Sequence, residues 1–305
     1  MKKIIYLLIL VSIFMQGQNN PAVIKGKIER ISNFESKFIS SRNIDVWLPD
    51  NYNKKKKYAV LYMHDGQMLF DAELTWNKQA WEVEEVISKL TNEKKIKEII
   101  VVGIWNSGET RHNDYFPQKP FEKLTIFQQD SIYKLERSKG MKLFNGKVNS
   151  DNYLKFITQE LKPYIDKKYN VYTKKEHTFI AGSSMGGLIS MYAICEYPEI
   201  FGGAACISTH WTGIFQTENN PIPEKFLDYL KDNLPNPKTH SFYFDYGTEG
   251  IDAFYEPTQQ KVDQLLKEKG YSTKNWLTKK YIGENHSEAA WQKRLHIPLI
   301  FLIKS

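Results

Sequence analysis

Short apolar runs that alternate with helical segments are the feature that most restricts how this chain can fold. Tyr58–Met63 and Ile99–Ile104 are apolar at almost every position, which is typical of strands buried on both faces of a sheet. Further strand-like runs and helical segments follow one another at 81–90, 153–164, 177–181, 186–197, 203–208, 241–246, 257–269, 276–282 and 288–303. This alternation predicts an α/β fold with a mainly parallel central sheet and helices on both faces.

Three local features refine this prediction. Alternating residues at 23–30 and 36–48 predict an antiparallel pair of strands that opens the sheet. The closing helix should be kinked at Pro298, because proline has no backbone N–H to donate. The stretch at about 106–151 is too long for an ordinary connection, so we interpret it as an insertion that caps one end of the sheet. We assign 18–305 to a single domain that contains this insertion.

The N-terminus has the pattern of a secretory signal peptide. Lys2 and Lys3 precede an apolar run at 4–15, which is too short to cross a bilayer comfortably, and the chain then turns polar. We predict a signal peptide at 1–17 with cleavage near Gly17, and an uncleaved N-terminal anchor is the alternative. The predicted location is periplasmic or secreted, with no stable membrane anchor after cleavage.

The charge balance argues against a nucleic-acid-binding protein. The 305 residues include 42 Lys and Arg against 35 Asp and Glu, a net charge of +7. Nucleic-acid binding needs a concentrated basic stripe, whereas the one dense basic run, Lys54–Lys57, lies in a predicted loop. Metal-ligand spacings of the Cys-x-x-Cys or His-Glu-x-x-His type are absent, so we predict no metal site.

Gly182-Ser-Ser-Met-Gly186 is the most specific chemical motif in the chain. It follows a predicted strand and opens a predicted helix, the context in which G-x-S-x-G raises a serine above a sheet edge. We therefore predict that Ser184 is a nucleophile, with Ser183 as a less favourably placed alternative. A glycine-rich turn without chemistry is the other interpretation.

A serine hydroxyl is a weak nucleophile and needs a base. In enzymes with this motif the chain order is serine, acid, histidine, so the base should come late. His286 lies in a polar loop directly after a predicted strand, whereas His296 lies inside the closing helix. We predict that His286 is the base. His210 precedes every candidate acid and could line the pocket.

The acid should follow the strand predicted at 241–246. Asp245 lies within that strand and is placed too deep, whereas Glu249 and Asp252 lie in the loop after it. We favour Asp252 and keep Glu249 as the alternative. The acid would hold the tautomer of His286 and stabilise its imidazolium form.

The loop after the strand at 58–63 should complete an oxyanion hole. Gly66 allows its backbone to approach a ligand closely, and we expect the backbone N–H groups of Gln67 and Met185 to be the donors. A simple turn at this loop is the alternative interpretation. Residues near the predicted strand ends are candidate substrate contacts, and these are Asp65, Trp105, Arg111, Tyr115 and Trp211.

Four motifs together resemble the putative-esterase family of α/β-hydrolases, which includes esterase D, enterochelin esterase-like and feruloyl or acetyl-xylan esterase-like proteins. The resemblance covers about 44–302, and its motifs are Met63-His-Asp-Gly-Gln-Met-Leu-Phe-Asp71, Gly182-Ser-Ser-Met-Gly-Gly187, Tyr197-Pro-Glu-Ile-Phe-Gly-Gly203 and His286-Ser-Glu288. It implies the α/β-hydrolase fold, no cofactor, and ester hydrolysis through an acyl-enzyme. It assigns the nucleophile to Ser184, the base to His286 and the oxyanion donors to Gln67 and Met185. The chain departs from the family where many relatives carry the acid, because Gly250 stands at that position.

The expected function is that of a secreted or periplasmic serine esterase that acts on a small-molecule or carbohydrate ester, such as acetyl or feruloyl groups on carbohydrate. A siderophore ester hydrolase of the enterochelin type is the alternative within this chemistry. A non-catalytic ligand-binding protein on the same fold and an acyltransferase with the same triad are further alternatives.

Overall fold

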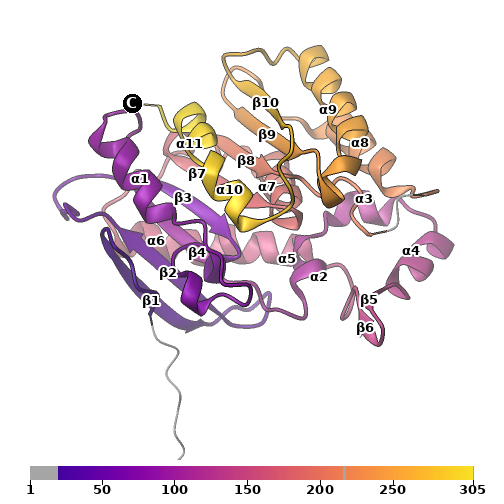
Figure 1. Cartoon of the computed structure of the whole chain (residues 1–305), viewed down its shortest axis with the longest axis horizontal. Helices are drawn as coiled ribbons and strands as arrows, with labels where there is room; N and C mark the ends of the chain where they lie inside the picture. Colours follow the sequence, from indigo (N-terminus) through magenta and orange to yellow (C-terminus); the bar gives the residue numbers. More distant parts are fainter. Residues whose placement is uncertain (1–19, 216–217, 305) are drawn as a thin grey trace, which may run out of the picture.

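An eight-stranded sheet runs through the computed structural model, which describes residues 20–215 and 218–304 (Figure 1). Its strand order is β1-β2-β4-β3-β7-β8-β9-β10. The strands are β1 (Lys27–Phe34), β2 (Arg42–Leu48), β3 (Ala59–His64), β4 (Ile99–Ile104), β7 (Thr178–Ser183), β8 (Gly203–Ile207), β9 (Ser241–Gly247) and β10 (Trp276–Tyr281). The predicted signal peptide at 1–17 lies outside the described residues.

Only β2 runs against its neighbours in this sheet. It pairs antiparallel with β1 and β4, whereas all other adjacent strands are parallel. The carboxyl ends of β3, β4, β7, β8, β9 and β10 therefore meet at one edge of the sheet. In open α/β sheets this edge is where ligands bind.

Helices cover both faces of the sheet, as the alternation in the sequence predicted. Val60 and Tyr62 of β3 pack on one face, whereas Leu61 and Met63 pack on the other, because side chains alternate along a strand. The second face is covered by α1 (Val83–Asn92), α10 (Glu288–Arg294) and α11 (His296–Leu302). The first face is covered by α5 (Ser150–Lys155), α6 (Lys162–Lys168), α7 (Met185–Glu196), α8 (Ile222–Asn233) and α9 (Glu256–Glu268).

The first opening strand lies four residues later than predicted, and the second is shorter than predicted. β1 begins at Lys27, just after Gly26 with its φ of 73°. β2 begins at Arg42, because the Ser36 hydroxyl accepts the N–H groups of Phe38 and Ile39 and holds a turn before it.

The closing helix breaks earlier than the predicted kink at Pro298. α10 ends at Arg294 and α11 begins at His296. The break lies one turn before the proline, because its ring would clash with the carbonyl of residue 294.

Helix α8 has no counterpart among the sequence predictions. Pro221 and Pro223 favour a loop in a local pattern. Proline is nevertheless tolerated at the start of a helix, and here Pro221 is the N-cap and Pro223 lies in the first turn.

The stretch at 106–151 folds into α2 (Arg111–Tyr115), α3 (Gln118–Glu122), α4 (Ile126–Tyr133) and the hairpin of β5 (Glu136–Ser138) and β6 (Met141–Lys142). Figure 1 shows α4 and this hairpin projecting at the lower right. Phe116, Phe121 and Phe144 anchor the segment in the same core as the sheet. The segment therefore packs on the same core as the sheet.

Candidate active site

A sharp turn between β7 and α7 presents Ser184. Its backbone has φ of 59° and ψ of −123°, and its N–H donates to the carbonyl of Ile207 at 2.9 Å. A Cβ atom at Gly182 would lie 2.8 Å from the carbonyl carbon of Gly186, so the turn closes only with glycine there. Strain of this kind is stored at functional sites when the surroundings hold it in place. The structure thus places Ser184 at the apex of a sharp strand-to-helix elbow.

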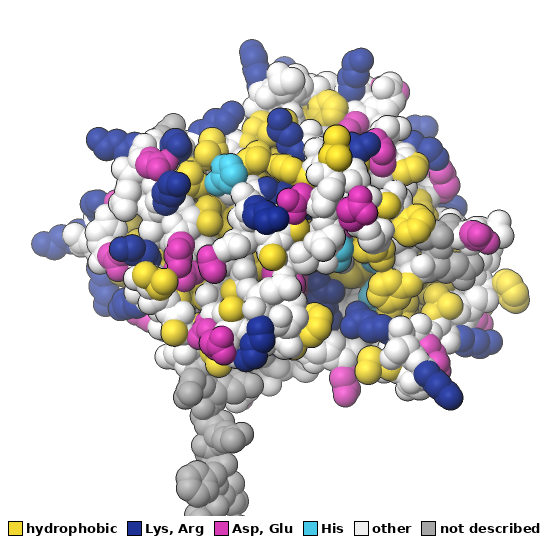
Figure 2. Space-filling model, viewed as in Figure 1, with side chains coloured by type: hydrophobic (Ala, Val, Ile, Leu, Met, Phe, Trp, Pro, Cys, Tyr) yellow, Lys and Arg dark blue, Asp and Glu magenta, His cyan; other side chains and the backbone are white. Residues whose placement is uncertain are grey.

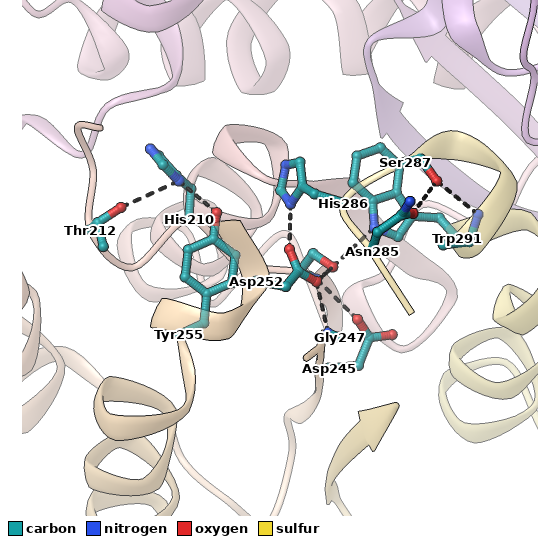
Figure 3. A network of polar contacts seen from close by, with 12 residues as sticks. His210, Thr212, Asp245, Gly247, Asp252, Tyr255, Asn285, His286, Ser287 and Trp291 are labelled. Atoms are coloured by element: carbon teal, nitrogen blue, oxygen red, sulfur yellow. Dashed lines mark hydrogen bonds and ion pairs between the residues drawn. The ribbon is translucent and has the colours of Figure 1, made fainter. Parts of the chain in front are cut away.

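Asp252 is the carboxylate that meets His286. The distance between His286 Nδ1 and Asp252 Oδ1 is 2.5 Å (Figure 3). The other carboxylate oxygen, Oδ2, accepts the Ser208 hydroxyl at 2.6 Å and the Gly247 N–H at 2.7 Å. Burial by itself would raise the pKa of Asp252, but the hydrogen bond and charge of His286 and the other donors outweigh it and hold the pKa below its usual value.

The other candidate acids point elsewhere. Glu249 is exposed at the start of the loop. Asp245 is fully buried and accepts hydrogen bonds from Arg294 and from the Ser208 N–H. His296, the alternative base, is exposed on α11. The structure brings Asp252 and His286 together and leaves the three alternatives apart from this pair.

A buried network of hydrogen bonds supports the Asp252 carboxylate. The Ser208 hydroxyl, which bonds Asp252, also accepts the indole N–H of Trp291 at 3.0 Å and a guanidinium N–H of Arg294 at 2.8 Å. Arg294 in turn pairs with Asp245 at 3.0 Å. Ser208 was not predicted from the sequence. The one feature that could have pointed to it is its position at the end of the strand predicted at 203–208.

Ser184 and His286 line the same cleft, which has a volume of about 720 Å³. Gln67 and Met185, the predicted oxyanion donors, also line it. The N–H of Met185 is the first of α7, and the first N–H groups of a helix have no acceptor within it. A Cβ atom at Gly66 would lie 2.6 Å from the carbonyl carbon of Gly103, so the loop that carries Gln67 can pack on β4 only with glycine.

Arg111 and Asp65 form a bidentate ion pair at the cleft wall. Arg111 Nε and Nη2 donate to the two Asp65 oxygens at 2.7 Å each, and Asn106 Nδ2 donates to Oδ1 at 2.7 Å. Burial by itself would raise the pKa of Asp65. The charge and hydrogen bonds of Arg111 outweigh this effect, so the pKa lies below its usual value. The guanidinium group of Arg111 is therefore already paired with a carboxylate of the protein, although the side chains of Arg111 and Asp65 both line the cleft.

The three aromatic candidates for substrate contact are engaged in packing. Trp105 donates its indole N–H to Asp45 at 2.7 Å, and Trp211 donates to Gln259 at 2.8 Å. Tyr115 and Trp211 are buried, and none of the three lines the cleft. The aromatic side chains that do line it are Trp76, Trp81, Phe215 and Trp291.

Three further histidines line the cleft, and burial keeps each of them neutral. Burial lowers the pKa of His64 to about 3 and that of His112 to about 3. Burial also holds the pKa of His210 well below its usual value.

The described parts of the chain contain no cluster of His, Cys, Asp and Glu side chains that could hold a metal ion. No helix within 20–215 and 218–304 combines the length and apolarity needed to cross a bilayer.

Residues 36–302 match the protein family described as "Putative esterase". Over 240 residues the chain is 26% identical to the uncharacterized protein YbbA of Bacillus subtilis (strain 168), covering 76% of this chain and 80% of that one. A solved ferulic acid esterase superposes with a TM-score of 0.62 at 20% identity, covering 92% of this chain and 98% of that one. An IroE-like serine hydrolase from Shewanella oneidensis superposes with a TM-score of 0.67 at 17% identity, covering 91% and 80%.

The resemblance and the fold predicted from the sequence are thereby confirmed. The family match spans most of the chain, and the solved structures share its sheet and helices. This chain belongs to the "Putative esterase" family and is a carboxylic ester hydrolase with the α/β-hydrolase fold.

Proposed function

We propose that the protein is a serine esterase whose triad is Ser184, His286 and Asp252. The observation that carries this proposal is that His286, which is paired with the buried Asp252, lines one cleft with the elbow serine. Asp252 accepts the Nδ1–H of His286, so the unprotonated Nε2 is available as the base.

The reaction follows from these positions. His286 takes the hydroxyl proton as Ser184 Oγ bonds to the ester carbonyl carbon, and the N–H groups of Gln67 and Met185 stabilise the oxyanion. The carbon–oxygen bond to the alcohol then breaks, and His286 returns the proton to the departing oxygen. Water attacks the acyl-enzyme with the same base, which releases the acid and restores the serine.

The proposed substrates are acetyl or feruloyl esters on carbohydrate. The likeness to a ferulic acid esterase supports this class, as do two aromatic side chains that line the cleft and are exposed, Trp76 at 85% and Phe215 at 51%. A trianionic siderophore ester would need several free cations. Arg137 lines the cleft, but Arg111 is engaged by Asp65. We propose that the protein acts in the periplasm or outside the cell, on the basis of the signal-peptide pattern at 1–17.

Labelling with a fluorophosphonate probe tests the nucleophile. The wild-type protein and Ser183→Ala should be labelled, whereas Ser184→Ala should not. Persistence of the label in Ser184→Ala would refute the assignment. A folded wild-type protein that takes no label would favour a non-catalytic ligand-binding protein instead.

A panel of acetylated xylose, methyl ferulate and a catecholate ester tests the substrate class. We expect turnover of the first two compounds. Turnover of the catecholate ester alone would overturn the carbohydrate proposal in favour of a siderophore ester hydrolase. Transfer of the acyl group to an added alcohol faster than to water would identify an acyltransferase.

A further inference from the structure

Of the three further histidines that line the cleft, none of which the mechanism above uses, His210 lies beside the elbow. His210 follows β8, is 2% exposed and lines the same cleft as Ser184 and His286. Its backbone N–H donates to the carbonyl of Ser184 at 3.2 Å. This bond fixes His210 beside the elbow.

Two hydroxyl groups converge on one nitrogen of the His210 ring. Nδ1 lies 2.7 Å from the Tyr255 hydroxyl and 3.5 Å from that of Thr212 (Figure 3). Tyr255 is fully buried, and its hydroxyl hydrogen needs an acceptor. Nδ1 accepts this hydrogen, so the proton of the neutral ring is on Nε2.

Both partners keep these roles across the working pH range. Burial raises the pKa of Tyr255 well above its usual value, so its hydroxyl remains a donor. Burial and the neighbouring His112, His286, Arg111 and Arg137 hold the pKa of His210 well below its usual value. His210 therefore presents an uncharged N–H donor.

The unbonded nitrogen of His210 points away from the buried polar network. In Figure 3 it lies at the upper left of its ring, and the unbonded nitrogen of His286 lies at the top of its ring, so both lie away from the Asp252 carboxylate. The Tyr255 ring packs edge-on against both imidazoles, with centroid distances of 5.8 Å and 6.0 Å. His286 would hand its proton to the departing alcohol oxygen, and His210 lines the same cleft.

We propose that His210 is a specificity-determining residue whose Nε2–H donates to an oxygen adjacent to the scissile ester on the alcohol part of the substrate. The inference rests on the proposed esterase function. The hydrogen bond from His210 selects monoesters of vicinal diols and polyols over esters of simple alcohols. Tyr255 and Thr212 are positioning residues that fix the tautomer of the His210 ring. An uncharged donor recognises a hydroxyl or ring oxygen without requiring an anion.

Two model esters that differ by one hydroxyl test this role. They are trans-2-hydroxycyclohexyl acetate and cyclohexyl acetate, and the readout is the ratio of their kcat/KM values in the full-length mature protein. We expect the wild type to favour the hydroxylated ester, and His210→Leu to lower the ratio about tenfold because it removes one neutral hydrogen bond. His210→Gln, which keeps an N–H donor, should restore most of the ratio. Tyr255→Phe should lower the ratio in part, because the ring proton can then move to Nδ1.

The outcomes separate this inference from the proposed function. An unchanged ratio in His210→Leu, with turnover that still requires Ser184, would overturn the role of His210 and leave the esterase function standing. Hydrolysis of both esters by Ser184→Ala would refute the proposed mechanism instead. Thermal unfolding monitors the fold of each variant, and His210→Met replaces His210→Leu if that variant unfolds. An unchanged ratio in His210→Met overturns the inference equally.

Discussion

At the scale of single residues, the structure separates two carboxylates that lie three positions apart in the chain. Asp252 is fully buried against His286, whereas Glu249 is exposed. Asp252→Asn should lower kcat for 4-nitrophenyl acetate by about 10³- to 10⁴-fold, because the histidine loses the partner that holds its tautomer. Glu249→Gln is the matched control and should keep wild-type kcat. A large loss in the control instead would assign the acid to Glu249.

A second residue-scale prediction concerns a buried carboxyl on α1 that is not part of the proposed triad. Glu84 on α1 is 2% exposed, and its Oε2 has no hydrogen-bond partner. Burial raises its pKa from the ordinary 4.5 to about 7, and the nearby Glu85 and Glu82 add to the rise. The folded protein thus binds this proton more tightly than the unfolded chain, so stability should fall as pH rises from about 4.5 through 7.

Glu84→Gln should remove this dependence. We expect the free energy of unfolding in urea to increase by about 1–3 kcal/mol at pH 8 and to change little at pH 4. Glu73→Gln replaces an exposed carboxylate and is the control. An equal effect of Glu84→Gln at both pH values would show that ionisation of Glu84 is not responsible.

At the scale of elements, the elbow depends on how closely β7 and α7 approach each other. A Cβ at Gly182 would lie within 2.9 Å of three backbone atoms of Gly186, whereas a Cβ at Gly186 would meet its nearest atom, the His64 Cβ, at 3.4 Å. Gly182→Ala should therefore destabilise the protein by about 1–3 kcal/mol and lower activity, because backbone must shift. Gly186→Ala should lower the free energy of unfolding by less, as measured by urea titration of both variants. The reverse order would contradict this account of the turn.

Sequence patterns predicted the elements whose signals are local. The apolar runs of β3 and β4 and the glycines of the elbow are such signals, and each was found at its predicted place. The choice between Asp252 and Glu249 depends on a short 3₁₀ turn, Gly250–Phe254, that directs Asp252 inward from a Gly250 with φ of 63°. Such a turn has no periodic pattern. The burial of Trp211 likewise depends on α9, which supplies Gln259 from 48 positions away.

At the scale of the whole molecule, Arg294 joins the last helices to the active site. It is 3% exposed and bonds both Ser208 and Asp245, so α10, β8 and β9 meet at one cation. Arg294→Met should destabilise the fold by about 3–5 kcal/mol, because it leaves a buried aspartate unpaired. It should also lower kcat, because Ser208 loses a bond that orients it toward Asp252.

The double variant Arg294→Met/Asp245→Asn tests this explanation. It removes both charges and should recover part of the lost free energy of unfolding. Lys293→Met, at an exposed neighbouring position, should cost no more than about 1 kcal/mol. If the double variant is as unstable as the sum of both single variants, the pairing of Arg294 with Asp245 is not what stabilises this region.

The order of the triad along the chain has a consequence for biosynthesis. Ser184 and its elbow are complete long before the loop that carries His286 is synthesised, and α10 and α11 come later still. With the proposed triad, a ribosome-bound chain that stops before residue 286 has a nucleophile without a base, and one that stops before 291 lacks the Trp291 and Arg294 contacts to Ser208. Esterase activity should therefore arise only when the chain is nearly finished, so unfinished chains cannot attack esters while they are being made.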